Sequence, residues 1–305
     1  MFLHENRWSF KETLILTSKE TGIPPAIIER DYFQTLLLQH ISLIEKTPIT
    51  LGGIYAIQKT RGGINRPITV LEVSLRHEIH HNRKALERLV LGISEALDIL
   101  DLEANYSSLS TKKLYQEIEI WYPTYFCPKS SSSSFMLKIN NRVPINPVIR
   151  RSINSILSQS LSDWTCREYG VSDFKILTVS PYRMLADTML RLTDFFIKDD
   201  YASTATCVYD LSRLVNMFKW NDDKTIKRLR KIYRGVLYYY DETVINNDKA
   251  AVFTMTHMHL LEIALRSDDV KTAYNDTLLP TLIEEVSYEA CLDEIVRFLD
   301  LRLLT

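Results

Sequence analysis

Hydrophobic residues recur every three or four positions through much of the chain, which is the spacing of an amphipathic helix. This pattern predicts helices over residues 5–21, 26–44 and 82–100. The first helix should end at Gly22, and the second should follow Pro24-Pro25, because proline suits the first turn of a helix. The first hundred residues therefore contain three predicted amphipathic helices.

Apolar and polar residues alternate in shorter stretches, as expected for strands with one buried face. Strands are predicted over residues 114–122, 135–139 and 174–179. From Pro147 onward helical patterns dominate, over residues 148–161, 181–197 and 203–218, with three or four more helices over 224–304. The sum is an α/β (α+β) fold, with a small mixed sheet in residues 1–146 and a helical domain in residues 147–305.

The most distinctive stretch runs from Thr50 to Leu75. A short apolar run ends in Gly52-Gly53 and then becomes helical, so we predict a strand that turns abruptly into a helix. Glycine at that point allows a positive φ or a close approach to a ligand, and the start of the helix offers free backbone N–H groups. A second strand follows over residues 68–75, with one face apolar and the other carrying Glu72 and Ser74.

A strand, a Gly-Gly turn, a helix and a strand with polar residues two apart form the plan of a nucleotidyltransferase site. In that chemistry two carboxylates at positions i and i+2 hold Mg²⁺, which bridges the triphosphate and activates the attacking group. Here the two positions are Glu72 and Ser74, so one carboxylate is present. An ordinary glycine turn beside a half-buried strand has the same spacing, and the spacing alone leaves both interpretations open.

Composition narrows the class of protein. The chain has 305 residues, of which 46% are hydrophobic and 25% charged, as in globular proteins generally. Eight glycines are few for this length and favour helices over turn-rich β architecture. The formal net charge of −1 excludes electrostatic binding of nucleic acid by the molecule as a whole, so any such binding needs a local patch.

One local patch is evident in the sequence. Four basic residues recur three and four positions apart and share one helix face, namely Lys224, Lys227, Arg228 and Lys231. Tyr238-Tyr239-Tyr240 follows them. This segment is either an RNA-binding surface with aromatic stacking or a solvated charged face above core tyrosines.

The remaining motifs point to few alternatives. The four cysteines (Cys127, Cys166, Cys207 and Cys291) form no C-x-x-C pair, which argues against zinc ribbons and a disulfide framework. The run from His77 to His81 matches the H-E-x-x-H pattern of zinc metalloproteases, but its surroundings are polar and Glu103 is a poor third ligand. A solvated connection is the simpler interpretation, and bound zinc would favour the metalloprotease.

The chain has neither the apolar core of a signal peptide near its first residue nor a run of 18 apolar residues. We therefore expect a cytoplasmic protein without a membrane span.

Five stretches taken in order carry a resemblance to a known family. They are GIPPAIIERDY at 22–32, LGGIYAIQK at 51–59, EIEIWYP at 117–123, the predicted helix at 183–197, and VYDL at 208–211. They resemble elements of the AbiEii-type nucleotidyltransferase toxins of bacterial toxin–antitoxin and phage-defence loci. The likeness covers most of the chain.

The resemblance implies metal-dependent transfer of nucleotide from an NTP, with Mg²⁺ or Mn²⁺ as cofactor. It implies an RNA acceptor, tRNA in the better-understood members, or a protein acceptor, and a cognate antitoxin as partner. The implied catalytic residues are Glu72, Asp187 and Asp210, with Glu72 also the metal ligand. The implied nucleotide-binding residues are Gly52, Gly53, Lys59, Ser74 and Arg183.

The departures from the family pattern include the turn's Thr-Ser, which is Ile54-Tyr55 here, and several charged positions. The family's S-E-D-I-D-L strand is VLEVSL here, so its second aspartate is Ser74. A helical lysine is replaced by Thr188, and an Arg-His pair by Thr206-Cys207, which removes cations that would neutralise a triphosphate. Two hypotheses follow: a divergent active nucleotidyltransferase, and a catalytically degenerate relative that binds nucleotide, RNA or protein.

Overall fold

The computed structural model describes residues 2–76, 79, 82–105, 115–126, 132–141, 145–218, 223–240 and 257–300. The chain divides into two compact units. Unit 1 comprises Met1–Arg61 and Ile68–Val179, and unit 2 comprises Gly62–Pro67 and Ser180–Thr305.

Unit 1 is built on a seven-stranded mixed sheet with the strand order β3-β4-β5-β2-β1-β7-β6. The strands are β1 (Ile49–Gly52), β2 (Val70–Leu75), β3 (Glu103–Ala104), β4 (Tyr115–Pro123), β5 (Ser132–Asn140), β6 (Val148–Ile153) and β7 (Phe174–Val179). β1 lies between β2, its antiparallel partner, and β7, its parallel partner, while β2 also pairs in parallel with β5. The expected mixed sheet is confirmed.

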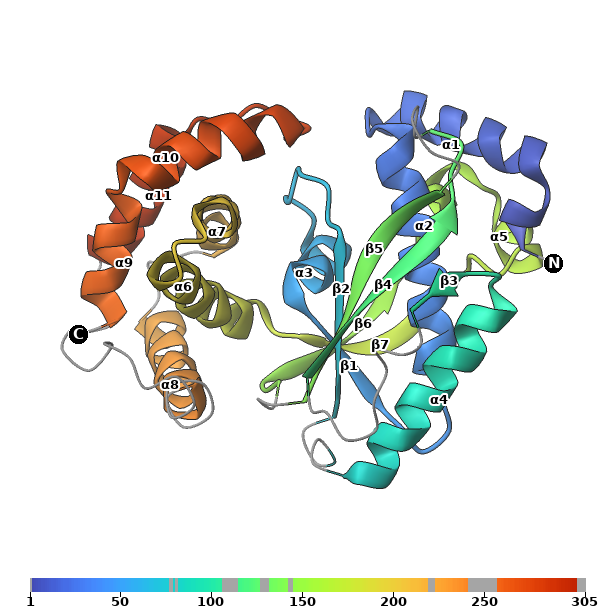
Figure 1. Ribbon diagram of the computed structural model, residues 1–305, viewed down its shortest axis with the longest axis horizontal. Coiled ribbons are helices and arrows are strands. Elements are labelled where there is room, and N and C mark those ends of the chain that lie inside the picture. The colour runs from blue at the N-terminus through green and yellow to red at the C-terminus, as the bar shows by residue number, and fades with distance from the viewer. Residues whose placement is uncertain are drawn as a thin grey trace. The chain divides into compact units, whose positions relative to one another are not determined.

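One face of this sheet packs into the core of unit 1. Alternate residues of β4 and β5, such as Ile118, Ile120, Leu137 and Ile139, are fully buried there. The helices α1 (Arg7–Thr21), α2 (Pro25–Ser42) and α4 (Arg83–Ile99) lie along one side of the sheet (Figure 1). Between β1 and β2 the chain forms the nine-residue helix α3 (Gly53–Arg61).

The predicted helices of this unit have physical end signals. Asn6 caps α1 with its side chain, and Gly22 ends it in the left-handed conformation at φ 72°. Pro25 occupies the first turn of α2, where its missing N–H costs nothing. Asn82 caps α4 in the same way as Asn6 caps α1.

The helix predicted over residues 148–161 is wrong. Val148–Ile153 is strand β6, paired antiparallel with β7, and the chain continues as a short 3₁₀ helix (Ile156–Ser160) and α5 (Asp163–Glu168). The β-branched residues that carried a helical spacing find a pairing partner in β7, and tertiary pairing outweighs the local pattern. Unit 1 consequently extends to Val179, beyond the predicted domain boundary after residue 146.

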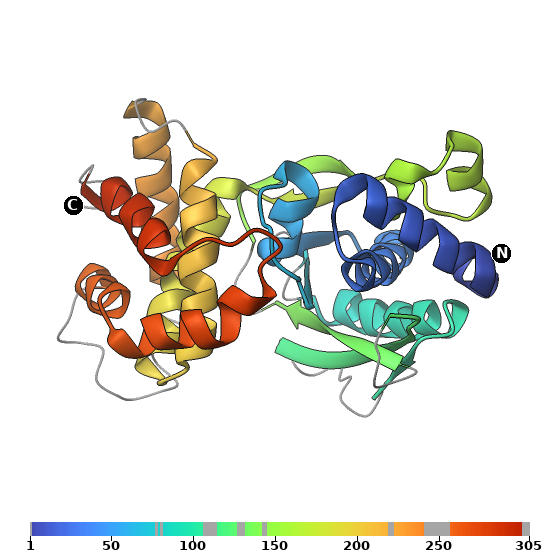
Figure 2. The same ribbon diagram turned by 90° about the horizontal axis from the view of Figure 1, so that it is seen from above.

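Unit 2 is helical, as expected for the second half of the chain. Its helices, coloured yellow through red in Figure 2, are α6 (Pro181–Ile197), α7 (Tyr201–Asn216), α8 (Asp223–Tyr240), α9 (His257–Leu265), α10 (Asp268–Ala273) and α11 (Tyr288–Asp300). A π-helical turn (Tyr274–Leu278) and a 3₁₀ turn (Leu279–Thr281) follow α10. None of the described helices is both long enough and apolar enough to cross a membrane.

The segment Gly62–Pro67 packs within unit 2, although it lies between α3 and β2 in the sequence. Arg66 donates two hydrogen bonds to the carboxylate of Asp210 on α7, at 2.7 and 2.6 Å. The backbone N–H of Asn65 donates to the hydroxyl of Tyr209 at 3.0 Å. A bidentate arginine–carboxylate pair is strong and directional, so it fixes this segment against α7.

We predict that Ser180→Ala destabilises the protein by about 1 kcal/mol, because the buried Ser180 hydroxyl accepts from the backbone N–H of Arg183 and caps α6. Urea denaturation followed by circular dichroism measures this loss. An unchanged midpoint and slope would show that the cap contributes nothing.

Candidate functional site

The Gly-Gly turn and Glu72 lie side by side in unit 1. Gly52 pairs with Glu72 across the β1–β2 ladder, and Gly53 begins α3 with φ 66°. A Cβ placed on Gly53 would lie 3.2 Å from the Oε2 atom of Glu72. Glycine is therefore required at position 53 both by its backbone conformation and by the closeness of the carboxylate.

Glu72 is a buried carboxylate, 4% exposed, on the face of β2 that also carries Ser74. The side-chain amide of Asn140 on β5 donates to its Oε1 atom at 3.3 Å. The Glu72 carboxylate lies beside Gly53, at the start of α3, where a helix carries a partial positive charge.

Ser74 lies two residues further along β2 on the same face as Glu72, opposite Thr50 of β1. Both hydroxyls are buried, each residue being 1% exposed, and neither makes a hydrogen bond within the described part of the chain. A buried hydroxyl without a partner costs free energy, and sites that carry such groups commonly hold a water molecule or a ligand. The i and i+2 positions therefore carry one carboxylate and one unsatisfied hydroxyl.

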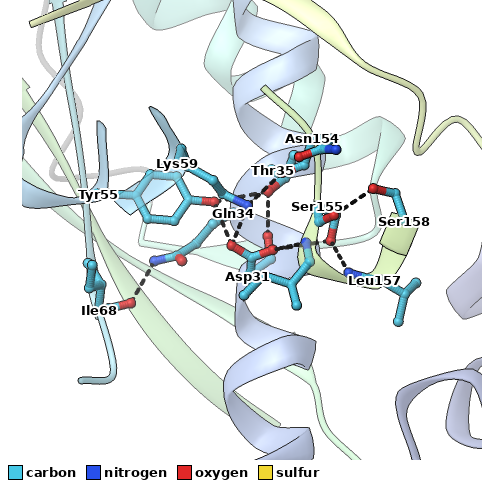
Figure 3. Close-up of polar contacts among 11 residues, drawn as sticks. Asp31, Gln34, Thr35, Tyr55, Lys59, Ile68, Asn154, Ser155, Leu157 and Ser158 are labelled. Atoms are coloured by element: carbon cyan, nitrogen blue, oxygen red, sulfur yellow. Dashed lines mark hydrogen bonds and ion pairs between the residues drawn. The ribbon is translucent and has the colours of Figure 1, made fainter. Parts of the chain in front are cut away.

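Lys59 lies in a buried ion pair. Its ammonium is 2.5 Å from the Oδ1 atom of Asp31 on α2 and donates to the carbonyl of Asn154 at 2.7 Å, as Figure 3 shows. Burial lowers the pKa of the Lys59 ammonium, and the adjacent Asp31 carboxylate opposes that shift. That Lys59 holds a phosphate stays a prediction, and it now requires the ammonium to leave two strong internal acceptors.

Asp31 is the centre of this cluster. Besides Lys59, it accepts from the hydroxyl of Tyr55 at 3.2 Å, the hydroxyl of Ser155 at 3.2 Å and the backbone N–H of Ile156 at 2.8 Å. These donors come from α3 and from the turn after β6 (Figure 3). We call Asp31, Tyr55, Lys59 and Ser155 the Asp31 cluster.

The other predicted catalytic and nucleotide-binding residues belong to unit 2, each in an arginine–carboxylate pair. Arg183 and Asp187 are joined one turn apart on α6, at 2.8 Å, with Arg183 buried. Asp210 is paired with Arg66. Catalytic roles for Asp187 and Asp210 stay predictions, and both carboxylates already have a cationic partner on this chain.

The positions where the resemblance led us to expect cations carry short neutral side chains. Thr188 is buried and donates to the carbonyl of Met184 at 2.8 Å. Cys207 is buried on α7, and burial raises the pKa of its thiol to about 12, so it stays protonated at neutral pH.

The structure thus brings together Gly52, Gly53, Glu72 and Ser74 as the sequence predicted. Two contributors were missed. Asn140 comes to Glu72 through the parallel β2–β5 pairing, which the sequence does not reveal. Asp31 lies on α2 beside the polar residues Glu29, Arg30 and Gln34, so no local signal in the sequence distinguishes its buried role.

The described residues contain no group of three or more histidine, cysteine or acidic side chains that could hold a metal. The H-E-x-x-H histidines lie outside the described residues, so the metalloprotease alternative stays untested. Glu72 is accordingly the one predicted carboxylate ligand, on a strand face it shares with Ser74 and Thr50.

No protein-family model matches the chain. No curated protein matches it in sequence. Among solved structures, MenT4, a nucleotidyltransferase toxin from Mycobacterium tuberculosis, is similar with a TM-score of 0.61. The chain shares its fold. The likeness covers 96% of this chain and 90% of MenT4 at 15% identity, and it confirms the predicted fold class.

We predict that the Asp31–Lys59 pair behaves as a coupled unit. Lys59→Met should cost about 3–5 kcal/mol, because it leaves the Asp31 charge buried without its counter-ion. Combining it with Asp31→Asn should cost less than the sum of the two single changes, since the double variant buries no charge. Urea denaturation of the four proteins gives the coupling energy.

A matched control is Lys138→Met, which breaks the more exposed pair between Lys138 and Glu117. Its expected cost is below about 1 kcal/mol. Additive costs for Lys59 and Asp31 would contradict the assignment of a coupled pair.

Proposed function

We propose that this protein is a toxin-like nucleotidyltransferase that transfers nucleotide from an NTP to an RNA acceptor, with tRNA the first acceptor to test. The observation that carries the proposal is the Gly52–Gly53 turn, which places the start of α3 against the carboxylate of Glu72. The likeness to a nucleotidyltransferase toxin supports it at the level of the fold.

The proposed roles follow from the chemistry of this turn. Backbone N–H groups at a helix start bind phosphate, and Gly53 lets the Glu72 carboxylate lie beside the start of α3 because no Cβ is in the way. Glu72 is the carboxylate proposed to act at the bound triphosphate. Ser74 and Thr50 supply two hydroxyls whose hydrogen-bonding capacity is unused among the described residues.

These residues fit a magnesium ion that takes part of its ligands from substrate. Mg²⁺ is held by one or two carboxylates plus phosphates and waters, and Glu72 is the one carboxylate on this face of β2. When bound, the ion would neutralise charge on the transferring phosphoryl group. Glu72 would orient it, and Asn140 would keep the Glu72 carboxylate in place.

The second candidate is a degenerate relative that binds nucleotide or RNA without turnover. Two observations favour it: Ser74 occupies the second acidic position, and the Lys59 ammonium lies against Asp31. Both candidates use the same turn for phosphate, so they differ in transfer and not in binding. Membership of the AbiEii-type family, and an antitoxin as partner, are part of the same proposal.

Transfer is tested by incubating the purified protein with each labelled NTP, Mg²⁺ or Mn²⁺, and total RNA. We predict label in RNA, and a loss of at least about 100-fold with Glu72→Gln, which keeps the size of the side chain but removes the charge. Asp163→Asn on the short helix α5 of unit 1 is a matched control that should retain activity. Folded protein that transfers no label to any RNA would support the degenerate alternative.

A second carboxylate should strengthen the metal site. Ser74→Asp is expected to lower the melting temperature in EDTA, because it buries a charge beside Glu72, and to recover that loss in millimolar Mn²⁺ or Mg²⁺. Differential scanning fluorimetry of wild type and variant measures both changes. A metal-independent melting temperature for Ser74→Asp would contradict a cation site at Glu72.

A further inference from the structure

Helix α8 of unit 2 has two contrasting faces. Its buried face consists of Leu229, Tyr233 and Val236. The opposite face carries exposed cations at helical spacing, namely Lys227, Arg228, Lys231 and Arg234, with Lys224 on the same side. We call Lys227, Arg228, Lys231 and Arg234 the basic stripe. At 100° per residue its members fall within an arc of about 120°.

The charge of α8 is unlike that of the rest of the chain. The helix carries six lysines and arginines against one acidic residue, Asp223, in a protein whose formal net charge is −1. Within the described part of the chain, no member of the basic stripe has a carboxylate within salt-bridge distance. Clustered cations repel one another, and an anionic partner relieves that repulsion.

An aromatic pair adjoins the stripe. The guanidinium of Arg228 lies 4.8 Å from the ring centroid of Tyr182 on α6. The ring of Tyr182 in turn lies 4.6 Å from that of Phe218. Tyr182 and Phe218 are both partly exposed residues. Cations on one line with an accessible aromatic ring beside them are the two components of single-stranded nucleic-acid binding sites.

We infer that the basic stripe binds the phosphate backbone of an RNA strand, with the Tyr182–Phe218 pair as a stacking surface for one unpaired base. The stripe spans about 10 Å along α8, which allows contacts to more than one phosphate. The inference rests on the proposed function only in naming RNA as the polyanion. The positive charge of the basic stripe and the aromatic pair are by themselves suited to a flexible chain of phosphates.

The test is binding of a fluorescent 20-nucleotide single-stranded RNA in EDTA and without NTP, measured by anisotropy at several salt concentrations. Replacing Lys227, Lys231 and Arg234 by glutamine should weaken binding at least about 10-fold at 0.1 M salt. It should also reduce the slope of log K against log salt by about 2, since each lost phosphate contact removes about 0.7. Tyr182→Leu should weaken binding about 5-fold or more and leave the slope unchanged.

The matched control replaces three exposed cations of α1, Arg7, Lys11 and Lys19, by glutamine. This variant has the same net charge as the stripe variant. An equal loss of affinity or slope in both would overturn the inference, as would wild-type protein that does not bind the RNA. Equally tight binding of polyglutamate, or tighter binding of DNA of the same sequence, would overturn the assignment to RNA.

The RNA-binding experiment tests the basic stripe independently of nucleotide transfer. Salt-dependent binding through the stripe by a protein that transfers no label would sustain this inference and remove the proposed chemistry. Transfer to RNA that is unimpaired in the stripe variant would sustain the proposed chemistry and remove this inference.

Discussion

The arrangement of unit 1 depends on a single buried charge pair. Asp31 and Lys59 are each about 5% exposed, and an ion taken out of water costs several kcal/mol unless its partners replace the lost hydration. Asp31 meets that condition with four donors from two other segments of the chain. The pair therefore holds α3 to α2 and to the turn after β6, and any displacement of α3 would leave a charge unpaired.

This constraint reaches the Gly-Gly turn. Lys59 lies six residues beyond Gly53 on one short helix, so the helix is fixed at one end by the ion pair and at the other by β1. Because α3 cannot slide, the close approach between Gly53 and Glu72 becomes a fixed property of the fold. The Lys59 ammonium is engaged in the ion pair, and the start of α3 carries the partial positive charge of a helix N-terminus.

The sequence predicted most of the elements, and its failures have physical causes. Helices with strong end signals, such as α1 with Gly22 and α6 with Pro181, were placed to within about two residues. β6 was missed because its spacing fits a helix equally well, and only the distant strand β7 decides between the two. The closeness of Gly52 to Glu72 was predictable, because a glycine turn and an alternating strand can each be recognised from the local sequence.

The partners of charged groups were not predictable in this way. Asp31 pairs with a residue 28 positions away, and Arg66 with one 144 positions away. Spacing shows which side chains share a helix or strand face, and it is silent about which residue of another element neutralises them. The functional roles expected for Lys59 and Asp210 came from the family resemblance, and a matching residue type does not distinguish a substrate-binding charge from one already paired.

The position of β1 has a consequence for how this protein can be divided. β1 is an inner strand because β7, more than a hundred residues later, supplies its second partner. A fragment ending near residue 146 would lack β6 and β7 and would expose the backbone of β1 as a sheet edge. Unprotected edges recruit strands from other molecules, so such a fragment is prone to aggregate. A fragment that contains the Gly52–Gly53 turn should therefore extend at least to Val179.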